Sequence, residues 1–283
     1  MERIKLAIER AKADGGLDAG IPAPSQQDAR WVPPPVANKI ATAPNRPVSS
    51  PAQYRHTAVV DLDPAHLERN RVIAHQKTHL ASWAFDVLRT QVLQKMDENG
   101  WRTIAVTSPS LESGKTLVSI NLALSIAQQS QRTALLVDFD LRRPSVARVL
   151  GLDQPVSLNE VLNGDVDVSE AMVSPGIARL VVLPTNRAMS RASELLSSPK
   201  VSNLIGELRQ RYDDRIVVFD LPPVLVADDV MAVLPHVDCV LMVVGSGVSS
   251  KAEVEEAMNR VARANLVGVV LNKDTAPAQQ DYY

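Results

Sequence analysis

The feature that most constrains the fold of this chain is an apolar run at 104–106, which leads through a polar loop into Gly114, Lys115 and Thr116. The β-branched run predicts a buried strand, and the Gly-Lys-Thr segment predicts the first turn of a helix. Backbone N–H groups and the positive end of the helix dipole would then face one point, where an anion binds. Lys115 would add a positive charge at the β- and γ-phosphates, and the Thr116 hydroxyl would ligate Mg²⁺.

Two further apolar runs end in carboxylates. Residues 134–137 are followed by Asp138 and Asp140, and residues 216–219 are followed by Asp220. In an open parallel α/β sheet, the carboxyl ends of the strands border one crevice, where ligands bind. The sequence therefore predicts that three carboxylates meet the phosphate loop at a single sheet edge, a pattern that indicates Mg-nucleotide chemistry.

Each of these signals also has a purely structural interpretation. An Asp at a strand end usually caps a helix or begins a turn, and a lone Gly-Lys-Thr sequence often occurs by chance. The conjunction carries more weight, because all three segments follow apolar strands in the order that a P-loop domain requires. The loop departs from the strict pattern in its single glycine, Gly114, in Pro109 at the place of the first glycine, and in Glu112, whose charge would repel phosphates unless it points outward.

Strands and helices alternate along the chain, which predicts a doubly wound, mostly parallel α/β sheet of the P-loop NTPase class. Apolar runs predict strands at 104–106, 134–138, 180–183, 216–220, 239–244 and 267–271. Helical periodicity predicts helices at 64–70, 79–98, 114–128, 193–211, 228–234 and 250–264, with short helices in the loop 148–164.

Composition divides the chain into four segments. Residues 1–13 have apolar residues on one helical face, which predicts an amphipathic helix that docks on a partner. Residues 14–55 are rich in proline, which predicts a disordered linker. Residues 56–274 form the predicted P-loop domain. Residues 275–283 are a predicted flexible tail, and they carry two of the four tyrosines in the chain.

The overall composition excludes several classes of protein. A net charge of −2 gives no basis for binding nucleic acid. The one cysteine, Cys239, permits no internal disulfide and suits a reducing compartment. No apolar run approaches the roughly 20 residues that span a bilayer. The predicted location is therefore the cytoplasm, with recruitment to the inner face of the membrane by a partner left open.

With these residues in view, the chain from about residue 80 onward resembles the bacterial tyrosine kinases of exopolysaccharide and capsule biosynthesis. Residues 134–144 are similar to the Walker A′ motif of that family, and residues 217–223 are similar to its Walker B motif. Residues 194–198 and 270–273 also resemble family segments. The N-terminal segment and proline-rich linker are similar to cytoplasmic autokinases of exosortase and polysaccharide clusters, whose membrane-spanning activator is a separate chain.

The resemblance implies an ATP- and Mg²⁺-dependent protein-tyrosine autokinase that regulates exopolysaccharide or capsule polymerisation or export. Its Walker A segment would hold the phosphates through Ser113, Gly114, Lys115 and Thr116. Mg²⁺ would be organised by Thr116, Asp138 and Asp220. The resemblance also makes Lys115, Asp138 and Asp140 the catalytic residues, with Asp138 or Asp140 acting on the tyrosine hydroxyl. Asn272 and Lys273 would contact the adenine, and Tyr282 and Tyr283 would accept the phosphate.

The implied partners are a separate membrane-spanning polysaccharide co-polymerase that acts as activator, a second copy of the chain for phosphorylation between molecules, and a cognate tyrosine phosphatase. Many family members carry Glu-x-x-Arg-x-x-Arg before the first strand for ring assembly, whereas this chain keeps only the last arginine, Arg89. Two alternatives stay open. One is a non-catalytic nucleotide-binding regulator of a co-polymerase. The other is a partition or septum-site type ATPase, which the serine at position 110 disfavours because that group has a lysine there.

Overall fold

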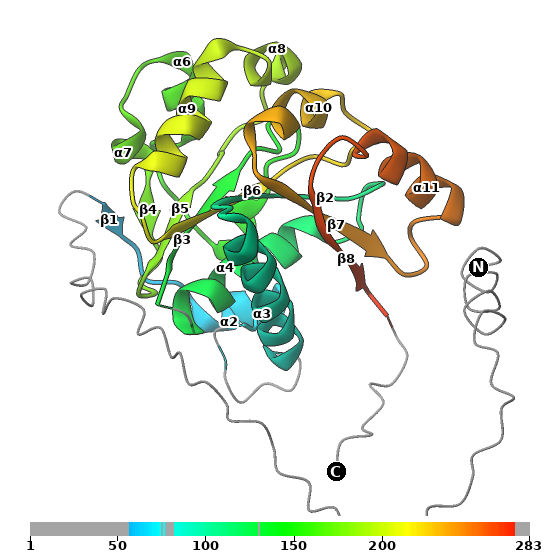
Figure 1. Cartoon of the computed structure of the whole chain (residues 1–283). Helices are drawn as coiled ribbons and strands as arrows, with labels where there is room; N and C mark the ends of the chain where they lie inside the picture. Colours follow the sequence, from blue (N-terminus) through cyan, green and yellow to red (C-terminus); the bar gives the residue numbers. More distant parts are fainter. Residues whose placement is uncertain (1–56, 75, 77–81, 130, 275–283) are drawn as a thin grey trace, which may run out of the picture. The chain divides into compact units, whose positions relative to one another are not determined.

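An eight-stranded sheet forms the centre of the structure, which is a computed structural model that describes residues 57–74, 76, 82–129 and 131–274 (Figure 1). The predicted helix at 1–13, the linker at 14–55 and the tail at 275–283 lie outside these described residues. The strand order across the sheet is β1-β4-β5-β3-β6-β2-β7-β8. The strands are β1 (Ala58–Val59), β2 (Thr103–Thr107), β3 (Thr133–Asp138), β4 (Val173–Ser174), β5 (Leu180–Leu183), β6 (Arg215–Asp220), β7 (Cys239–Gly245) and β8 (Leu266–Asn272).

The sheet is mostly parallel, as predicted. Every neighbouring pair of strands is parallel except β4 and β5, which pair antiparallel through Val173 and Val182. Strands β1 and β4 were not predicted, because each has only two residues and so shows no periodicity. The six predicted strands are all present, and they form the contiguous part of the sheet from β5 to β8.

Helices cover both faces of this sheet (Figure 1). They are α2 (Pro64–Arg69), α3 (Ser82–Asn99), α4 (Lys115–Gln129), α5 (Val146–Leu150), α6 (Leu158–Asn163), α7 (Val168–Ala171), α8 (Ala192–Leu196), α9 (Pro199–Gln210), α10 (Asp229–Val233), the 3₁₀ turn η1 (Leu234–His236) and α11 (Lys251–Arg260). One apolar cluster lies against α2 to α5 and the other against α6 to α11. In β2, Ile104 and Val106 belong to the first cluster and Ala105 to the second. Burial on both sides explains why these strands are continuous apolar runs.

Two predicted helices differ from the observed ones. The single helix predicted at 193–211 is in fact two, α8 and α9, because Pro199 has no N–H to continue the first helix and instead begins the second. The helix predicted at 250–264 ends at Arg260. Its start is as predicted, since Ser250 and Glu253 form a capping box.

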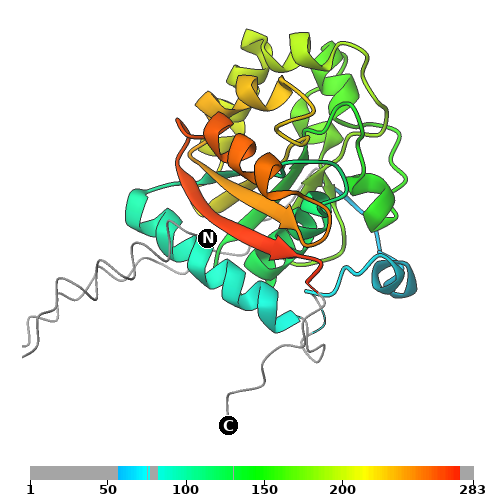
Figure 2. The same ribbon diagram turned by 90° about the vertical axis from the view of Figure 1, so that its right-hand side faces the viewer.

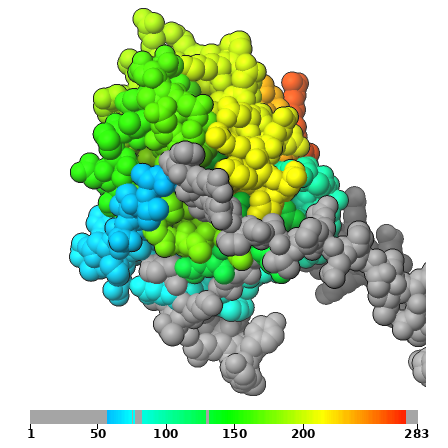
Figure 3. Space-filling view, turned by 90° about the vertical axis from the view of Figure 1, so that its left-hand side faces the viewer, coloured from blue at the N-terminus to red at the C-terminus, as the bar shows by residue number. Residues whose placement is uncertain are grey.

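The first described residues and α3 are packed onto the edges of the sheet. Figure 3 shows β1 and α2, in blue, beside green residues, and the His66 Nε2 donates to the Arg148 carbonyl at 3.0 Å. Figure 2 shows α3 running alongside β8, where Lys95 Nζ donates to the Val267 carbonyl at 2.7 Å. Across the ranges that the structure describes, none of the helices combines the length and the apolar character needed to cross a bilayer.

Candidate active site

The loop between β2 and α4 forms the predicted phosphate cradle. The Ser113 hydroxyl donates to the Ser110 carbonyl at 3.0 Å and so closes the loop on itself. Gly114 has a φ of +90°, and a Cβ atom there would lie 2.1 Å from Nδ2 of Asn272. The one glycine of the loop therefore stands where a side chain would be both strained and obstructed. Glu112 is exposed, so its carboxylate is solvated rather than buried among the other acids.

Lys115, the first residue of α4, lies between carboxylates from two neighbouring strands. Its Nζ is 2.8 Å from Oδ2 of Asp140 and 3.5 Å from Oδ2 of Asp220. Burial lowers the pKa of a lysine, but here the attraction of the Asp220 and Asp140 carboxylates outweighs burial, and the pKa of Lys115 is raised. The ammonium is thus a permanent positive charge at the edge where β3 and β6 end.

Asp220 is the last residue of β6 and is fully buried. The Thr116 hydroxyl donates to its Oδ2 at 2.6 Å, and the Ser119 hydroxyl lies 3.1 Å from its Oδ1. Burial raises the pKa of the Asp220 carboxyl, and the Lys115 charge offsets only part of this effect. A Thr at the start of the helix and an Asp at the end of a neighbouring strand are the pair that holds Mg²⁺ in P-loop NTPases.

Asp138 ends β3 and has both a structural and a chemical role. Its Oδ2 accepts the backbone N–H groups of Ser145 and Val146, each at 2.9 Å, so it caps the short helix α5. Its Oδ1 accepts the Asp140 N–H at 3.2 Å. Burial, followed by repulsion from Asp220, raises the pKa of Asp138 to about 8 despite these hydrogen bonds. The capping role weighed above from the sequence therefore holds for Asp138, and its role in the site stays a prediction.

The residues present fit a magnesium nucleotide. Three carboxyl groups, Asp138, Asp140 and Asp220, lie around the Lys115 ammonium, and a divalent cation bound there would take the place of the proton that Asp138 holds. Within the described part of the chain, no group of three or more His, Cys, Asp or Glu side chains has the arrangement of a complete metal site. Mg²⁺ usually takes one or two protein ligands and completes its shell with water and phosphate oxygens, which matches a site built on Thr116 and Asp220.

The residues predicted at the end of β8 fall into two groups. Asn272 reaches the phosphate loop, where its Nδ2 donates to the Ser113 carbonyl at 2.9 Å. Lys273 follows it, is exposed, and adopts a φ of +60°. Tyr282 and Tyr283 lie outside the described residues.

Known proteins resemble this chain over the region that contains the site. A family model described as an AAA domain matches residues 101–270. The tyrosine-protein kinase wzc of Salmonella typhi is 32% identical over 209 residues, which are 72% of this chain and 29% of that protein. The tyrosine-protein kinase YwqD of Bacillus subtilis is 28% identical over 218 residues, or 76% of this chain and 91% of that protein. The kinase domain of the Escherichia coli tyrosine kinase ETK superposes with a TM-score of 0.68 at 26% identity and covers 80% of this chain and 91% of that domain. The chain belongs to the bacterial tyrosine-kinase family of P-loop proteins.

The match covers very different shares of these relatives. The chain spans less than a third of the length of the Salmonella protein and most of the length of the Bacillus protein. The family resemblance predicted from the Walker A, A′ and B segments is confirmed, and so is the P-loop fold class.

The tyrosine-kinase fold of this chain also contains a second ionic cluster that the sequence did not predict. Arg142 Nε donates to Oδ2 of Asp229 at 2.7 Å, and Arg142 Nη2 donates to Oδ1 at 3.2 Å and to the Ser193 hydroxyl at 2.7 Å. The Ser193 hydroxyl also donates to Asp229. Burial would raise the pKa of Asp229, but the hydrogen bonds from Arg142 and Ser193 outweigh it and the pKa is lowered. No spacing in the sequence indicates this cluster, because its members come from the loop after β3 and from two separate short helices, α8 and α10.

The arginine that this chain retains from the ring-assembly pattern of the family is used inside the domain. Arg89 Nη1 lies 2.8 Å from Oδ1 of Asp86 and 3.1 Å from the Ser125 hydroxyl, and its side chain is only 14% exposed. It therefore ties α3 to α4. This contact gives Arg89 a role in packing that needs no second molecule.

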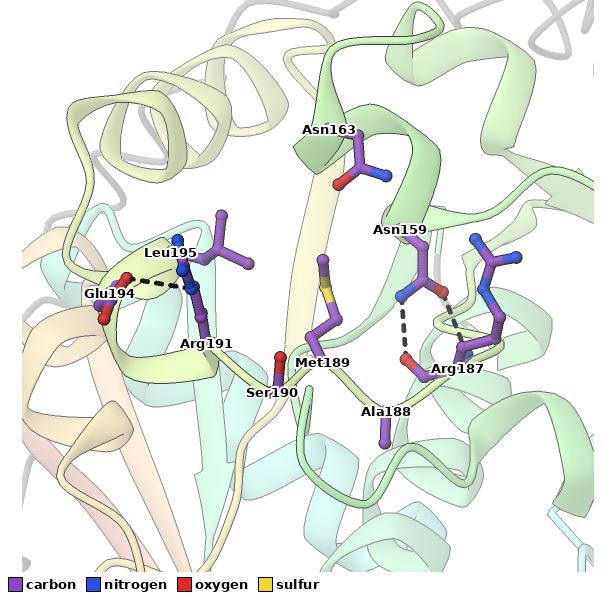
Figure 4. A pocket seen from close by; sticks show the side chains of 9 residues that line it. All are labelled: Asn159, Asn163, Arg187, Ala188, Met189, Ser190, Arg191, Glu194 and Leu195. Carbon is purple, nitrogen blue, oxygen red and sulfur yellow. Dashed lines mark hydrogen bonds and ion pairs between the residues drawn. The ribbon is translucent and has the colours of Figure 1, made fainter.

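A cavity of about 620 Å³ lies between α6 and the loop from β5 to α8 (Figure 4). Asn159 forms one wall and fixes the loop, because its Nδ2 donates to the Arg187 carbonyl at 2.8 Å and its Oδ1 accepts the Arg187 N–H at 3.0 Å. The Met189 N–H donates to the Leu141 carbonyl at 2.8 Å, which joins this loop to the segment after β3. The cavity contains none of the predicted phosphate or metal residues, so it is separate from the phosphate cradle.

Proposed function

We propose that this chain is an ATP- and Mg²⁺-dependent protein-tyrosine autokinase that regulates polymerisation or export of an exopolysaccharide or capsule. The observation that carries the proposal is the position of Lys115, whose ammonium lies between Asp140 and Asp220 at the start of the helix that follows the phosphate loop. The curated relatives named as tyrosine-protein kinases support the type of reaction.

The residues of the site would divide the work as follows. The backbone N–H groups at Ser113 to Thr116 bind the phosphates, and Lys115 neutralises their charge. Thr116 and Asp220 hold Mg²⁺, with Asp138 nearby. When bound, Mg²⁺ neutralises the charge that develops on the transferred phosphoryl group.

Asp140 is the better candidate for accepting the proton of the tyrosine hydroxyl. Asp138 accepts three backbone N–H groups, which fix it as the cap of α5. Asp140 accepts the Arg143 N–H at 3.0 Å and otherwise faces the Lys115 ammonium. Because the pKa of Asp138 is raised to about 8, that carboxyl already carries a proton near neutral pH and is the poorer base.

We propose Tyr282 and Tyr283 as the acceptors, with transfer from one molecule to another. Tyr212 is a poor acceptor, because its ring packs 3.9 Å from the guanidinium carbon of Arg215. Ten residues beyond Lys273 extend at most about 33–36 Å, so a tail that reaches its own site would need a tight return path. A neighbouring molecule's site is easier to reach.

The proposed partners follow from the same reasoning. A separate membrane-spanning co-polymerase would activate the chain, and residues 1–13 are the proposed docking segment that recruits it from the cytoplasm to the inner face of the membrane. A cognate tyrosine phosphatase would reverse the reaction.

The test is intact-mass analysis of the purified chain after incubation with ATP and Mg²⁺. We expect added phosphate that is lost on deleting residues 281–283, retained in Tyr212→Phe, and formed at a rate that increases with protein concentration. The deletion variant should still bind ATP. A deletion variant that labels fully on tyrosine would reject Tyr282 and Tyr283 as acceptors.

The same experiment tests the alternatives. ATP binding without any added phosphate would favour a non-catalytic nucleotide-binding regulator. This alternative is tested because the loop departs from the strict P-loop pattern in having a single glycine, Gly114. A partition-type ATPase would release free phosphate without labelling itself. The serine at position 110 argues against that class, since its hydroxyl lies 3.2 Å from the Ser249 hydroxyl and cannot supply a lysine charge.

A further inference from the structure

The end of β8 is attached to the phosphate loop through one side chain. Asn272 is 159 residues from Ser113 in the sequence, and its Nδ2 donates to the Ser113 carbonyl at 2.9 Å. Ser113 is 1% exposed. The Asn272 carbonyl in turn accepts the Ser246 N–H at 2.8 Å, so the strand end is itself held by the residue after β7.

The ends of β7 and β8 together form a wall against the phosphate loop. A Cβ atom on Gly245 would lie 3.1 Å from Cα of Ser113, and a Cβ atom on Gly114 would lie 2.1 Å from Nδ2 of Asn272. The Ser249 hydroxyl lies 3.2 Å from the Ser113 hydroxyl. Glycines at both places permit this close approach.

The contact on the Ser113 carbonyl fixes the direction of a neighbouring N–H group. The Ser113 carbonyl and the Gly114 N–H belong to one peptide plane, and in a trans peptide they point in opposite directions. When Asn272 holds the carbonyl, it also fixes the direction of the Gly114 N–H, which belongs to the cradle.

We propose that Asn272 is a positioning residue of the phosphate loop, and that its main contribution to nucleotide binding is made through the Ser113 carbonyl rather than through the base. The inference rests on the proposed nucleotide-binding function. It differs from an adenine contact, because a loop-positioning residue affects every ligand that has a phosphate chain, whatever base it carries.

The test compares three ligands in calorimetric titrations of the full chain: ATP, GTP and inorganic tripolyphosphate. In Asn272→Ala we expect affinity for all three to fall by the same factor, roughly three- to tenfold, because a neutral hydrogen bond that orders the loop is lost. The matched control is Asn265→Ala, which removes the same kind of bond near the other end of β8, where Asn265 Nδ2 donates to the Asp238 carbonyl at 2.9 Å. The control should leave all three affinities unchanged.

A second variant, Asn272→Leu, nearly keeps the volume of the side chain but cannot donate a hydrogen bond. It should show the same equal losses, and it replaces the alanine variant if that variant proves unstable. A melting temperature within a few degrees of the parent would show that the loss is local. The inference is overturned if ATP affinity falls while tripolyphosphate affinity does not, if all three affinities are unchanged, or if Asn265→Ala causes the same losses. A parent chain that binds none of the three ligands would reject the proposed function, whereas a parent that binds them and an Asn272→Ala variant that does not lose affinity equally would reject only the inference about Asn272.

Discussion

Two ionic clusters lie along the edge where the parallel strands end, and they differ in charge balance. In the first, the Lys115 ammonium contacts Asp140 and Asp220, with Asp138 close by. In the second, Arg142 meets a single carboxylate, Asp229. The first cluster has pKa values raised at Asp138 and Asp220, whereas the pKa of Asp229 is lowered. The same residue types thus make an unbalanced site that favours an added cation and a balanced pair that holds loops together.

The charge balance can be broken most severely at Lys115. Lys115→Met should remove a charge-assisted phosphate contact worth about 1.5–3 kcal/mol, which weakens ATP binding roughly ten- to a hundredfold. Calorimetric titration with ATP measures it, with Arg142→Met as the matched control, since that change removes a cation from the second cluster. ATP affinity that is unchanged in Lys115→Met would exclude the phosphate-loop assignment.

A matched pair of Asp→Asn changes tests whether the clusters serve different purposes. Asp229→Asn should lower the stability by about 1.5–3 kcal/mol, because the charge-assisted bonds from Arg142 and Ser193 are weakened. Asp138→Asn should lower it by only about 0.5–1.5 kcal/mol at neutral pH, because a carboxyl with a pKa near 8 is already uncharged there and the amide nitrogen fails only to accept the Asp140 N–H. Thermal unfolding without nucleotide measures both.

The activity of the same two variants should show the reverse order. Asp138→Asn should impair Mg²⁺-dependent tyrosine labelling, and so should Asp220→Asn, because an amide cannot give up a proton to become a negatively charged group when the metal binds. Asp229→Asn should label at nearly the parental rate once it is folded. If both Asp138→Asn and Asp220→Asn labelled at the parental rate, the site at the ends of the strands would be wrong.

The pH dependence of stability should have opposite signs in the two clusters. The folded chain holds a proton on Asp138 up to a pH of about 8, whereas the unfolded chain releases it near pH ~4. The contribution of Asp138 to the stability is therefore fully present at low pH and is lost as the pH rises from about 4 towards 8. Asp229 behaves oppositely, because its pKa is lowered by folding: its contribution is present above pH ~4 and is lost as the pH falls below that value.

The melting temperature of the nucleotide-free parent chain should thus decline as the pH rises from 5 to 9, a range that includes the pKa of about 8 at Asp138. Asp138→Asn should reduce that slope, and Asp229→Asn should leave it as it is. A parental profile that rises over this range would contradict the raised pKa of Asp138.

The sequence predicted the first cluster and missed the second for a physical reason. Asp138 and Asp220 end or directly follow apolar runs, Lys115 and Thr116 follow one through a short polar loop, and parallel strands bring such ends together. Arg142, Ser193 and Asp229 lie on loops and short helices, whose positions depend on packing rather than on periodicity. Strands β1 and β4 were missed for the same reason, because two residues are too few to show a periodicity. The break before Pro199 was missed because the apolar periodicity continues across it, although the proline ends one helix and begins the next.

The smallest expected difference concerns two serines that each serve one cluster. The Ser193 hydroxyl donates to Asp229, and the Ser119 hydroxyl lies 3.1 Å from Oδ1 of Asp220. Ser193→Ala should lower stability by about 0.5–1.5 kcal/mol with no change in the Mg²⁺ requirement, because it weakens only the balanced pair. Ser119→Ala should raise the Mg²⁺ concentration for half-maximal labelling about two- to fivefold, because loss of a donor favours the protonated form of Asp220, and a metal ion must then displace a proton.

Thermal unfolding and a Mg²⁺ titration of tyrosine labelling, run on both serine variants, decide the point. The Ser119 hydroxyl also lies 2.9 Å from the Lys115 carbonyl, and its one proton is shared between this oxygen and Asp220, so Ser119→Ala will show some loss of stability, and the Mg²⁺ midpoint is the measurement that separates the two effects. Equal Mg²⁺ midpoints in both variants would mean that Asp220 does not exchange a proton for the metal. The raised pKa of Asp220 would then reflect burial alone, and the contrast between the two clusters would be one of packing and not of function.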